Sequence, residues 1–305
     1  MRRADESVVL IDGPWRHRGV YANGSRFHVV EAGQGPLVLL LHGFPEFWWT
    51  WRHQIEPLVA AGYRAVAVDL RGYGASDKPP RGYDGYTLAS DVAGLVRALG
   101  ERDAALVGHD LGGYLAWTTA CLYPRTVRRV AMIGSAHPRR LRSALAADPA
   151  QQRASRRLGL YQLPRYEHRL TRDDSAQVGR MLREWSAPQW TTTADFADYE
   201  TVCRQAFAIS QAAFCALEYF RWAVRSLTRP SGWRFAELLA QPIDGPVLQV
   251  HGALDTNILA STAHGSGRYA TGPYDWRLLP QIGHFPHAEA ADEVNDLLLH
   301  WLKQG

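Results

Sequence analysis

An aspartate occupies a position where a serine is common in one short motif of this chain. Asp110 lies in "LVGHDLGGYLAW", residues 106–117, where an apolar run leads into glycines and then into an apolar helical pattern. This is the layout of a nucleophile elbow, a sharp strand-to-helix turn that exposes the side chain at its tip. A carboxylate gains little by attacking a carbonyl, but at saturated carbon it forms an ester that water can cleave. Asp110 therefore predicts chemistry on a carbon that carries a leaving group, as in epoxides and alkyl halides.

Two further residues could hydrolyse such an ester. His284, in "QIGHFPHAEA", follows the last expected strand and could activate water; its nearest rival, His287, already lies in the following helix. Asp255, in "HGALDTN", follows another apolar run and could hold the histidine in one tautomer. Nucleophile, acid and histidine thus occur in the chain order that nucleophile-elbow hydrolases use. We predict that Asp110, Asp255 and His284 form a catalytic triad.

Hydrolysis of the ester also needs two N–H donors for the oxygen that becomes negative. The amide of Leu111, the residue after the nucleophile, is one candidate. The other is the amide of Phe44, in the "HGFP" loop that follows the first buried run. The alternative is that this loop is an ordinary tight turn.

The elements that must position these residues form an alternating pattern. Short apolar runs typical of strands buried on both faces are separated by amphipathic helical stretches, which predicts a mostly parallel sheet flanked by helices. The runs cover residues 37–41, 64–70, 104–107, 127–133, 246–250 and 276–279. Before them, Asn23-Gly24 joins two alternating segments and predicts a hairpin at the edge of the sheet. The expected fold class is α/β.

Residues 138–240 interrupt this alternation. The segment is rich in arginine at first, then helical and aromatic, with no clear buried strand. We therefore expect a core made of residues 1–137 and 241–305, and a helical lid made of residues 138–240. Because ligands of open α/β sheets bind at the carboxyl ends of the strands, the lid is expected to cover that edge.

Composition excludes several classes of protein. The chain has 305 residues, 46% hydrophobic and 21% charged, which suits one large domain or a domain with an insertion. No run approaches the roughly 20 apolar residues of a membrane span. Asp5 and Glu6 stand where a secretory apolar stretch would begin, so a cytoplasmic protein is expected. The cysteines, Cys121, Cys203 and Cys215, lack the spacing of a disulfide framework or a metal site.

The net charge of +4 is spread along the chain, which argues against a nucleic-acid partner. The expected partners are a small apolar molecule and water, and the predicted chemistry needs neither a metal nor a cofactor. Whether the chain forms a homodimer stays open.

Several motifs resemble those of soluble epoxide hydrolases, in the branch of the α/β-hydrolase superfamily that also holds dehalogenases. They are "HGFPEFWWTWRHQ" at 42–54, "DLRGYGASDKP" at 69–79, "GHDLGG" at 108–113, and the later "HGALD" and "GHFPHAE". The resemblance covers about residues 20–137 and 245–303. It implies an α/β-hydrolase fold and an epoxide opened to a vicinal diol through an ester on the aspartate.

The resemblance also implies roles for single residues. Asp110 is alkylated, and His284 with Asp255 activates water. Phe44 and Leu111 hold the oxyanion. Trp48 lines the substrate site.

The dehalogenase patterns are not met. Haloalkane dehalogenases hold the departing halide with a tryptophan after the nucleophile and an asparagine or tryptophan after the His-Gly pair, where this chain has Leu111 and Phe44. Haloacetate dehalogenases carry arginines one and four residues past the nucleophile, where this chain has Leu111 and Tyr114. An epoxide is therefore the favoured substrate. A dehalogenase, and a ligand-binding relative with reduced or no turnover, remain as alternatives.

The lid departs from the family pattern, in which two tyrosines protonate the oxygen released from the epoxide. "YQLP" at 161–164 resembles one tyrosine motif but puts Arg157 in the tyrosine position, and "EYFR" at 218–221 puts Phe220 in the other. Tyr161 and Tyr219 lie close by and are the candidates for the acid, or for substrate binding. The alternative is that both only pack in the lid. Arginine is too strong a base to donate a proton readily, but Arg157 could stabilise an alkoxide by its charge.

Overall fold

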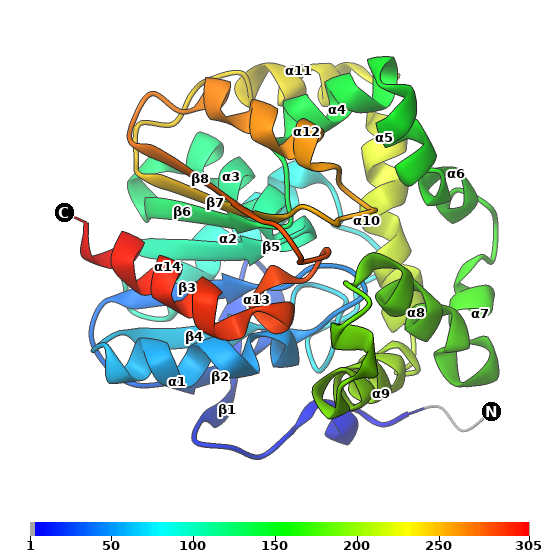
Figure 1. Ribbon diagram of the computed structural model, residues 1–305, viewed down its shortest axis with the longest axis horizontal. Coiled ribbons are helices and arrows are strands. Elements are labelled where there is room, and N and C mark those ends of the chain that lie inside the picture. Colours follow the sequence, from blue (N-terminus) through cyan, green and yellow to red (C-terminus); the bar gives the residue numbers. More distant parts are fainter. Residues whose placement is uncertain (1–3, 305) are drawn as a thin grey trace.

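A single mixed sheet forms the centre of the computed structural model, which describes residues 4–304 (Figure 1). The strands of the described chain follow the spatial order β1-β2-β4-β3-β5-β6-β7-β8. Their bounds are β1 (Arg16–Ala22), β2 (Ser25–Ala32), β3 (Leu37–Leu41), β4 (Arg64–Val68), β5 (Ala104–His109), β6 (Val127–Ile133), β7 (Val247–Gly252) and β8 (Tyr274–Leu279). The β1–β2 hairpin and the β2–β4 pair are antiparallel, and the other pairs are parallel. The predicted mostly parallel sheet with an antiparallel edge is confirmed.

Helices cover both faces of the sheet. In Figure 1, α2 and α3 lie together behind the sheet, while α1 and α14 pack side by side in front of it. The helices of the core are α1 (Arg52–Ala60), α2 (Gly85–Ala98), α3 (Leu111–Leu122), α12 (Ala260–His264), α13 (Pro286–Glu289) and α14 (Ala291–Lys303). The 3₁₀ turns of the chain are η1 (Glu6–Val9), η2 (Trp48–Trp51), η3 (Pro124–Thr126), η4 (Trp190–Thr192) and η5 (Gly265–Tyr269). Because both faces are covered, every residue of β3 and β5 is buried.

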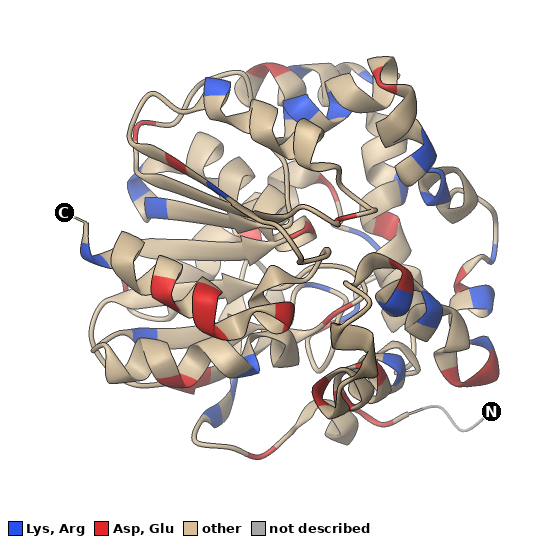
Figure 2. Cartoon of the chain, viewed as in Figure 1, with Lys and Arg blue, Asp and Glu red and all other residues tan. Residues whose placement is uncertain are grey.

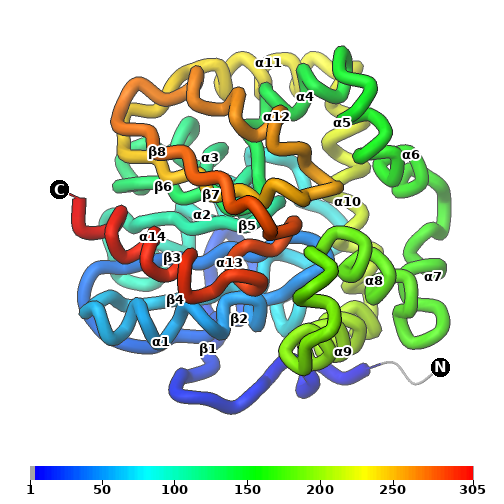
Figure 3. The backbone as a smooth tube through the Cα atoms, viewed as in Figure 1, coloured from blue at the N-terminus to red at the C-terminus, as the bar shows by residue number. Residues whose placement is uncertain are grey.

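Between β6 and β7 the chain leaves the sheet and forms only helices and turns. These are α4 (Pro138–Ala147), α5 (Pro149–Ala154), α6 (Arg157–Tyr161), α7 (Glu167–Leu170), α8 (Arg172–Trp185), α9 (Ala194–Phe207), α10 (Ala212–Ser226) and α11 (Pro230–Leu238). The backbone tube shows this segment returning to the sheet at β7 (Figure 3). Tyr161 and Phe220 from this segment pack against Phe44 in the loop after β3, and Trp185 packs against His284 after β8. The helical segment therefore lies over loops at the carboxyl ends of the strands. The expected domain boundaries at 1–137 and 241–305 include residues 1–3 and 305, which lie outside the described residues.

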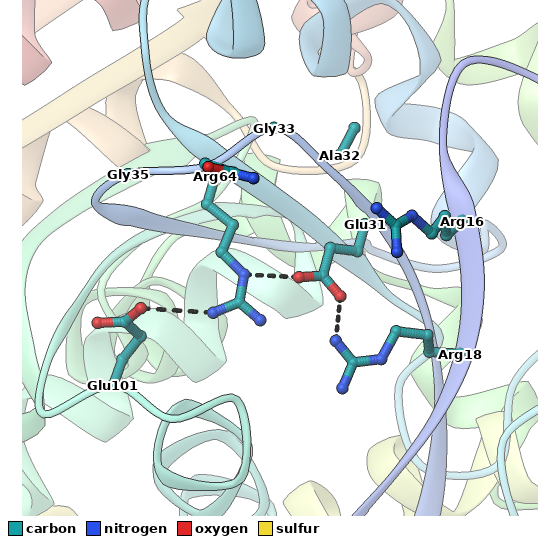
Figure 4. A pocket seen from close by; sticks show the side chains of 9 residues that line it. Arg16, Arg18, Glu31, Ala32, Gly33, Gly35, Arg64 and Glu101 are labelled. Carbon is teal, nitrogen blue, oxygen red and sulfur yellow. Dashed lines mark hydrogen bonds and ion pairs between the residues drawn. The ribbon is translucent and has the colours of Figure 1, made fainter.

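Acidic and basic residues lie interspersed along the outer helices (Figure 2). The end of the sheet opposite the loops that the helical segment covers contains a polar cavity of about 520 Å³. A chain of ion pairs lies in this cavity (Figure 4). Glu31 on β2 pairs with Arg18 on β1 and, at 2.6 Å, with Arg64 on β4, which lies 3.4 Å from Glu101. Burial raises the pKa of Glu31, but its two arginine partners lower that pKa by a larger amount. The net shift of the pKa is therefore downward. These ion pairs connect the antiparallel edge strands to the parallel part of the sheet.

Within the described part of the chain, no helix combines the length and apolar character required to cross a bilayer.

Candidate active site

The backbone at Asp110 is strained in the way that an elbow requires. Asp110 connects β5 to α3 with φ +45° and ψ −110°, a conformation that costs a non-glycine residue about 1–3 kcal/mol. The flanking glycines allow the chain to turn so sharply. A Cβ on Gly112 would lie 1.9 Å from the carbonyl oxygen of Leu41, and one on Gly108 would lie 2.2 Å from the backbone of Gly112. The side chain of Asp110 is therefore held out at the end of the sheet by close backbone contacts that only glycine permits.

The structure brings the three predicted triad residues together. The Nδ1 atom of His284 lies 2.7 Å from Oδ2 of Asp255, and its Nε2 atom lies 3.9 Å from Oδ1 of Asp110. The other oxygen of Asp255 accepts hydrogen bonds from the backbone amides of Asn257 and Ile258, at 2.8 and 3.0 Å. Because Asp255 accepts the Nδ1 proton, the Nε2 atom of His284 is the nitrogen that faces Asp110.

Charges around the histidine set its protonation state. Burial lowers the pKa of His284, but the charge and hydrogen bond of Asp255 and the charge of Asp110 raise it more, to about 9. Burial raises the pKa of Asp255, yet the charges and hydrogen bonds of His284 and His251 outweigh this and hold that pKa below its usual range. The pKa of His284 therefore lies above neutral, which favours the protonated imidazole in its position between Asp255 and Asp110.

One of the two predicted oxyanion donors contacts the Asp110 oxygen that is not the one paired with His284. The amide of Phe44 donates to Oδ2 of Asp110 at 3.1 Å. Leu111 is the first residue of α3, where backbone N–H groups have no partner within the helix. The carbonyl of Asp110 accepts hydrogen bonds from the hydroxyl of Ser135 and the amide of Tyr114, at 2.8 and 3.0 Å, which fixes the turn.

A cavity of about 70 Å³ opens beside Asp110. Its apolar walls are Phe44, Leu141, Leu158, Trp185, Phe220 and Ile258. The polar groups that join Asp110 there are Ser155, Arg157, Tyr161 and Asn257. Such a site is a mostly apolar pocket with a few polar groups near the carboxylate of Asp110, as expected for a small apolar ligand.

The two lid tyrosines point to different places. Tyr161 lines the cavity, and its hydroxyl lies 3.5 Å from the sulfur of Met181, a weak acceptor. Burial raises the pKa of Tyr161, so the hydroxyl keeps its proton. Tyr219 is not among the residues that line this cavity; its hydroxyl donates to the carbonyl of Arg71 at 2.7 Å. Of the two predicted lid tyrosines, Tyr161 is thus the one that lines the cavity beside Asp110.

The residues in the two family tyrosine positions both reach the cavity. Phe220 packs edge-on against Phe44, with 5.0 Å between ring centroids. Arg157 lies over the ring of Trp185 and forms an ion pair with the half-exposed Glu184. The cavity wall therefore carries the guanidinium of Arg157 at the position where the family pattern has a tyrosine hydroxyl.

Trp48, which was expected to line the substrate site, is not among the residues that line the cavity beside Asp110. Trp48 is fully buried elsewhere: its indole donates to the carbonyl of Val9 at 2.7 Å and packs edge-on against Trp15. It lies in η2, where its amide donates to Asp69 at 2.9 Å. These contacts place the ring against the N-terminal segment of the chain.

A cluster of buried polar side chains, which sequence reasoning missed, supports the site through a contact with the backbone of His284. The Nε2 atom of His109 lies 2.7 Å from the carbonyl oxygen of His284, which can only accept, so this nitrogen carries a proton. The Nδ1 atom of His109 lies 2.5 Å from Glu46, which also accepts from the amide of Gly43 at 2.9 Å. The cluster thus joins the loops after β3, β5 and β8. Its sequence signal is the glutamate that follows "HGFP" and the histidine that precedes Asp110.

His287, the rival base, belongs to this cluster. Its Nε2 atom lies 2.5 Å from the hydroxyl of Thr50 and 3.4 Å from Glu46. Burial lowers the pKa of His287, and the charge of His109 adds to this; hydrogen bonding to Glu46 offsets only part of it, leaving a pKa of about 4. His287 is therefore neutral, and its Nε2 atom contacts Thr50 and Glu46.

Asn257 is a second residue that the sequence reasoning missed. Its side-chain amide lies 3.2 Å from Nε2 of His284, and it lines the cavity beside Asp110. The only signal in the sequence is its position two residues after Asp255.

Comparisons with known proteins agree with this architecture. Residues 36–256 match the family model described as the alpha/beta hydrolase fold. Epoxide hydrolase 3 of Xenopus tropicalis is 32% identical over 292 residues, covering 92% of this chain and 76% of the Xenopus protein. The crystal structure of a mutant of an epoxide hydrolase from Bacillus megaterium has a TM-score of 0.83 at 26% identity, covering 94% of this chain and all of that one.

An epoxide hydrolase from an endophytic Streptomyces is similar over a comparable length. Its TM-score is 0.81 at 29% identity, and the match covers 95% of this chain and 96% of that one. Together with the family model, these relatives indicate the family within which the aspartate at the elbow and the buried histidine are interpreted. The chain is a hydrolase of the α/β-hydrolase superfamily and belongs to its epoxide-hydrolase branch.

Proposed function

We propose that this protein hydrolyses epoxides to vicinal diols through an alkyl ester on Asp110. In the first step a carboxylate oxygen of Asp110 attacks one epoxide carbon, and the bond from that carbon to the ring oxygen breaks. The released oxygen takes the hydroxyl proton of Tyr161, with the cation of Arg157 stabilising the negative charge as it develops. The products of this step are an ester on Asp110 and a free hydroxyl on the neighbouring carbon.

In the second step, His284 takes a proton from water as the water oxygen attacks the ester carbonyl. The amides of Phe44 and Leu111 stabilise the oxygen that becomes negative. The ester bond to the substrate carbon then breaks, and the imidazolium of His284 returns its proton to the departing diol. Asp110 keeps one oxygen from water together with the remaining proton of that oxygen, and this proton passes to His284. The carboxylate of Asp110 and the imidazolium of the free enzyme are thereby restored.

The electrostatics of the site favour this order of events. In the free enzyme the charge of Asp110 helps to raise the pKa of His284. Formation of the ester removes that charge, so the pKa of His284 falls and the neutral base needed for hydrolysis becomes available. The proton that His284 loses balances the one that Tyr161 gave to the substrate.

One observation carries the proposal: an aspartate, not a serine, occupies the elbow, 3.9 Å from a buried histidine paired with a second carboxylate. The names of the relatives support an epoxide as the substrate. We also propose that the helices of residues 138–240 act as the lid that excludes water during the first step. A dehalogenase of the same mechanism is the second candidate, since the first step differs only in its leaving group.

Intact-mass measurement of the His284→Gln variant tests this proposal. The variant should still be alkylated but should not hydrolyse the ester, so an adduct accumulates. With an epoxide, the added mass should equal the whole epoxide and should map to the peptide that contains Asp110. An adduct formed only with haloalkanes, lacking the halogen, would identify a dehalogenase. No adduct from a broad epoxide panel, with turnover by the unaltered enzyme also absent, would favour a relative that binds ligands without turnover.

A further inference from the structure

The first part of the helical segment carries a local excess of positive charge. Residues 138–172 contain nine arginines but only two acidic residues, Asp148 and Glu167. This part contributes +7 to the net charge of +4, so the other residues of the chain together contribute −3. The even spread of charge expected from the sequence therefore does not hold here. Figure 2 shows basic residues on α5, α6 and α7, which follow one another along one edge of the molecule in Figure 1.

The arginines on the outside of this part have no acidic partner. Four of them are exposed and form no ion pair with any residue between positions 4 and 304: Arg153, Arg156, Arg165 and Arg169. Of the two acidic residues, Glu167 already pairs with Arg221 at 3.0 Å. Asp148 accepts from the amide of Ala150 at 2.8 Å, at the start of α5. The four guanidinium groups can therefore bind anions outside the chain.

Two leucines project from the same stretch of chain. Leu160 and Leu163 are 41% and 46% exposed, and they lie between Arg156 and Arg165. No acidic residue occurs from position 149 to position 166. At the surface of an anionic membrane, apolar side chains enter the boundary between headgroups and acyl chains, while cations stay with the headgroups. The exposed side of residues 153–169 has both components of such a site.

The aromatic rings of this stretch are not available to a nucleic acid. Tyr161 and Tyr166 are 2% and 3% exposed, and the hydroxyl of Tyr166 accepts from the side-chain amide of Gln177 at 2.7 Å. Proteins that bind single-stranded nucleic acids combine cations with exposed aromatic rings on which the bases stack. Here exposed leucines accompany the arginines instead, so a lipid surface fits this side better than a nucleic acid does.

The inner side of the same stretch faces the candidate active site. On α6, Arg157, Leu158 and Tyr161 line the cavity beside Asp110, whereas Leu160 is exposed. An α-helix with its side chains is about 10 Å wide. A membrane on the outer side of α6 would therefore lie close to the cavity, and an apolar molecule in the bilayer would have a short path to Asp110.

We propose that residues 153–169 bind the surface of an anionic lipid membrane. The two exposed leucines enter the boundary between headgroups and acyl chains, and the exposed arginines pair with lipid phosphates. This docking does not depend on the proposed function. Its consequence rests on that function: apolar epoxides held in the bilayer reach Asp110 without first dissolving in water.

Sedimentation of the intact chain with lipid vesicles tests the docking. Vesicles of phosphatidylcholine alone are compared with vesicles of three parts phosphatidylcholine to one part phosphatidylglycerol. Binding is measured at about 0.1 M and about 1 M salt, where charges are screened beyond about 10 Å and about 3 Å. We expect binding to the anionic vesicles at the lower salt, and binding at least about tenfold weaker to the neutral vesicles or at the higher salt. Equal binding to the two kinds of vesicle, or to neither, would overturn the inference.

Two combined variants separate the contributions of charge and of the leucines. Arg153→Gln, Arg156→Gln and Arg165→Gln together should weaken binding to the anionic vesicles by about 10²-fold, or about fivefold for each arginine. Leu160→Ser with Leu163→Ser leaves the charge unchanged and should weaken binding by about tenfold, because less apolar surface leaves water. Binding that the leucine variant does not weaken would show adsorption by charge alone and would contradict insertion.

A matched control tests whether the position of the arginines matters. Arg97→Gln, Arg102→Gln and Arg125→Gln together remove the same charge from exposed arginines of the core, none of which is in an ion pair between positions 4 and 304. This variant should bind the anionic vesicles within about twofold of the unaltered protein, because distant charges are screened. Both arginine variants should keep their unfolding temperature. Equal weakening by the two would show that only the total charge matters and would refute the proposed site.

Two further results distinguish the partner and the function. Binding of polyglutamate without binding of anionic vesicles would identify an acidic protein surface as the partner in place of lipid. Asp110→Asn should bind the vesicles as the unaltered protein does. Failure of every epoxide to form an ester on Asp110 would therefore overturn the proposed function and leave the docking standing, whereas failure to bind vesicles would overturn only the docking.

Discussion

Replacing Asp255 by asparagine should separate the two steps of the reaction. Asparagine can keep the acceptor oxygen that receives the amides of Asn257 and Ile258. Its NH₂ group would then replace the oxygen that lies 2.7 Å from Nδ1 of His284. Two donors cannot face each other, so the imidazole would place its proton on Nε2. The lone pair needed to activate water would then point away from the ester on Asp110.

The structure gives the size of the expected effect. His284 is fully buried, and its pKa is raised from the usual 6.5 to about 9 despite the opposing effect of burial. A rise of that size corresponds to about 3 kcal/mol of stabilisation of the imidazolium, or roughly 300-fold. Asp255 supplies the largest favourable part of this shift. Hydrolysis of the ester should therefore slow by at least about 10²-fold, whereas alkylation of Asp110, which does not use His284, should stay within a few-fold.

Rapid-quench kinetics with intact-mass detection would measure both steps of the Asp255→Asn variant. We expect one equivalent of epoxide to be consumed quickly per enzyme, followed by slow turnover with the ester as the main enzyme species. Asp244→Asn is the matched control, because Asp244 is exposed and lies outside the site. Equal slowing of the two steps, or slow turnover without any accumulated ester, would refute the assignment of Asp255 and His284 to hydrolysis.

Three further predictions concern the nucleophile, the acid and the protonation of the histidine. Asp110→Asn should abolish both turnover and ester formation; normal turnover, in protein shown by peptide mass not to have deamidated, would contradict the nucleophile assignment. Tyr161→Phe should slow alkylation by at least about 10²-fold. Tyr219→Phe should keep turnover but lose about 1 kcal/mol of unfolding free energy in urea, because its hydrogen bond to a loop carbonyl is buried. If Tyr219→Phe slowed alkylation and Tyr161→Phe did not, Tyr219 would be the acid instead of Tyr161. Because the folded pKa of His284 is raised, its contribution to stability is complete below pH 6.5 and is lost as the pH rises through about 9. The free energy of unfolding should therefore fall between pH 7 and pH 10. Because Asp110 helps to raise the pKa of His284, this fall should be smaller in Asp110→Asn than in the unaltered protein.

The core and the sharp turn at Asp110 could be predicted from sequence because their signals are local. Buried parallel strands must be apolar on both faces, so β3 and β5 appear as unbroken apolar runs. The elbow at Asp110 needs glycine at defined positions, because a Cβ on Gly112 would meet the backbone of β3. The order of Asp255 and His284 after their strands was enough to expect that they meet Asp110.

Side-chain direction in the lid could not be predicted in the same way. Successive residues of an α-helix point about 100° apart. On α10, Phe220 therefore reaches the cavity beside Asp110, while Tyr219 turns to the carbonyl of Arg71. Trp48 shows the same limit: a motif gives its place in the chain, but packing against Trp15 and Val9 decides where its ring lies.

The sequence by itself determined the fold class, the aspartate at the elbow and the order of Asp110, Asp255 and His284 after their strands, because each depends on residue type and spacing within short stretches. Only the tertiary structure decided which tyrosine lines the cavity beside Asp110 and which histidine lies between Asp255 and Asp110. Those features depend on side chains from α6, α10 and the loops after β5, β7 and β8, which are far apart in the chain and meet only when the sheet forms and the helical segment packs over it.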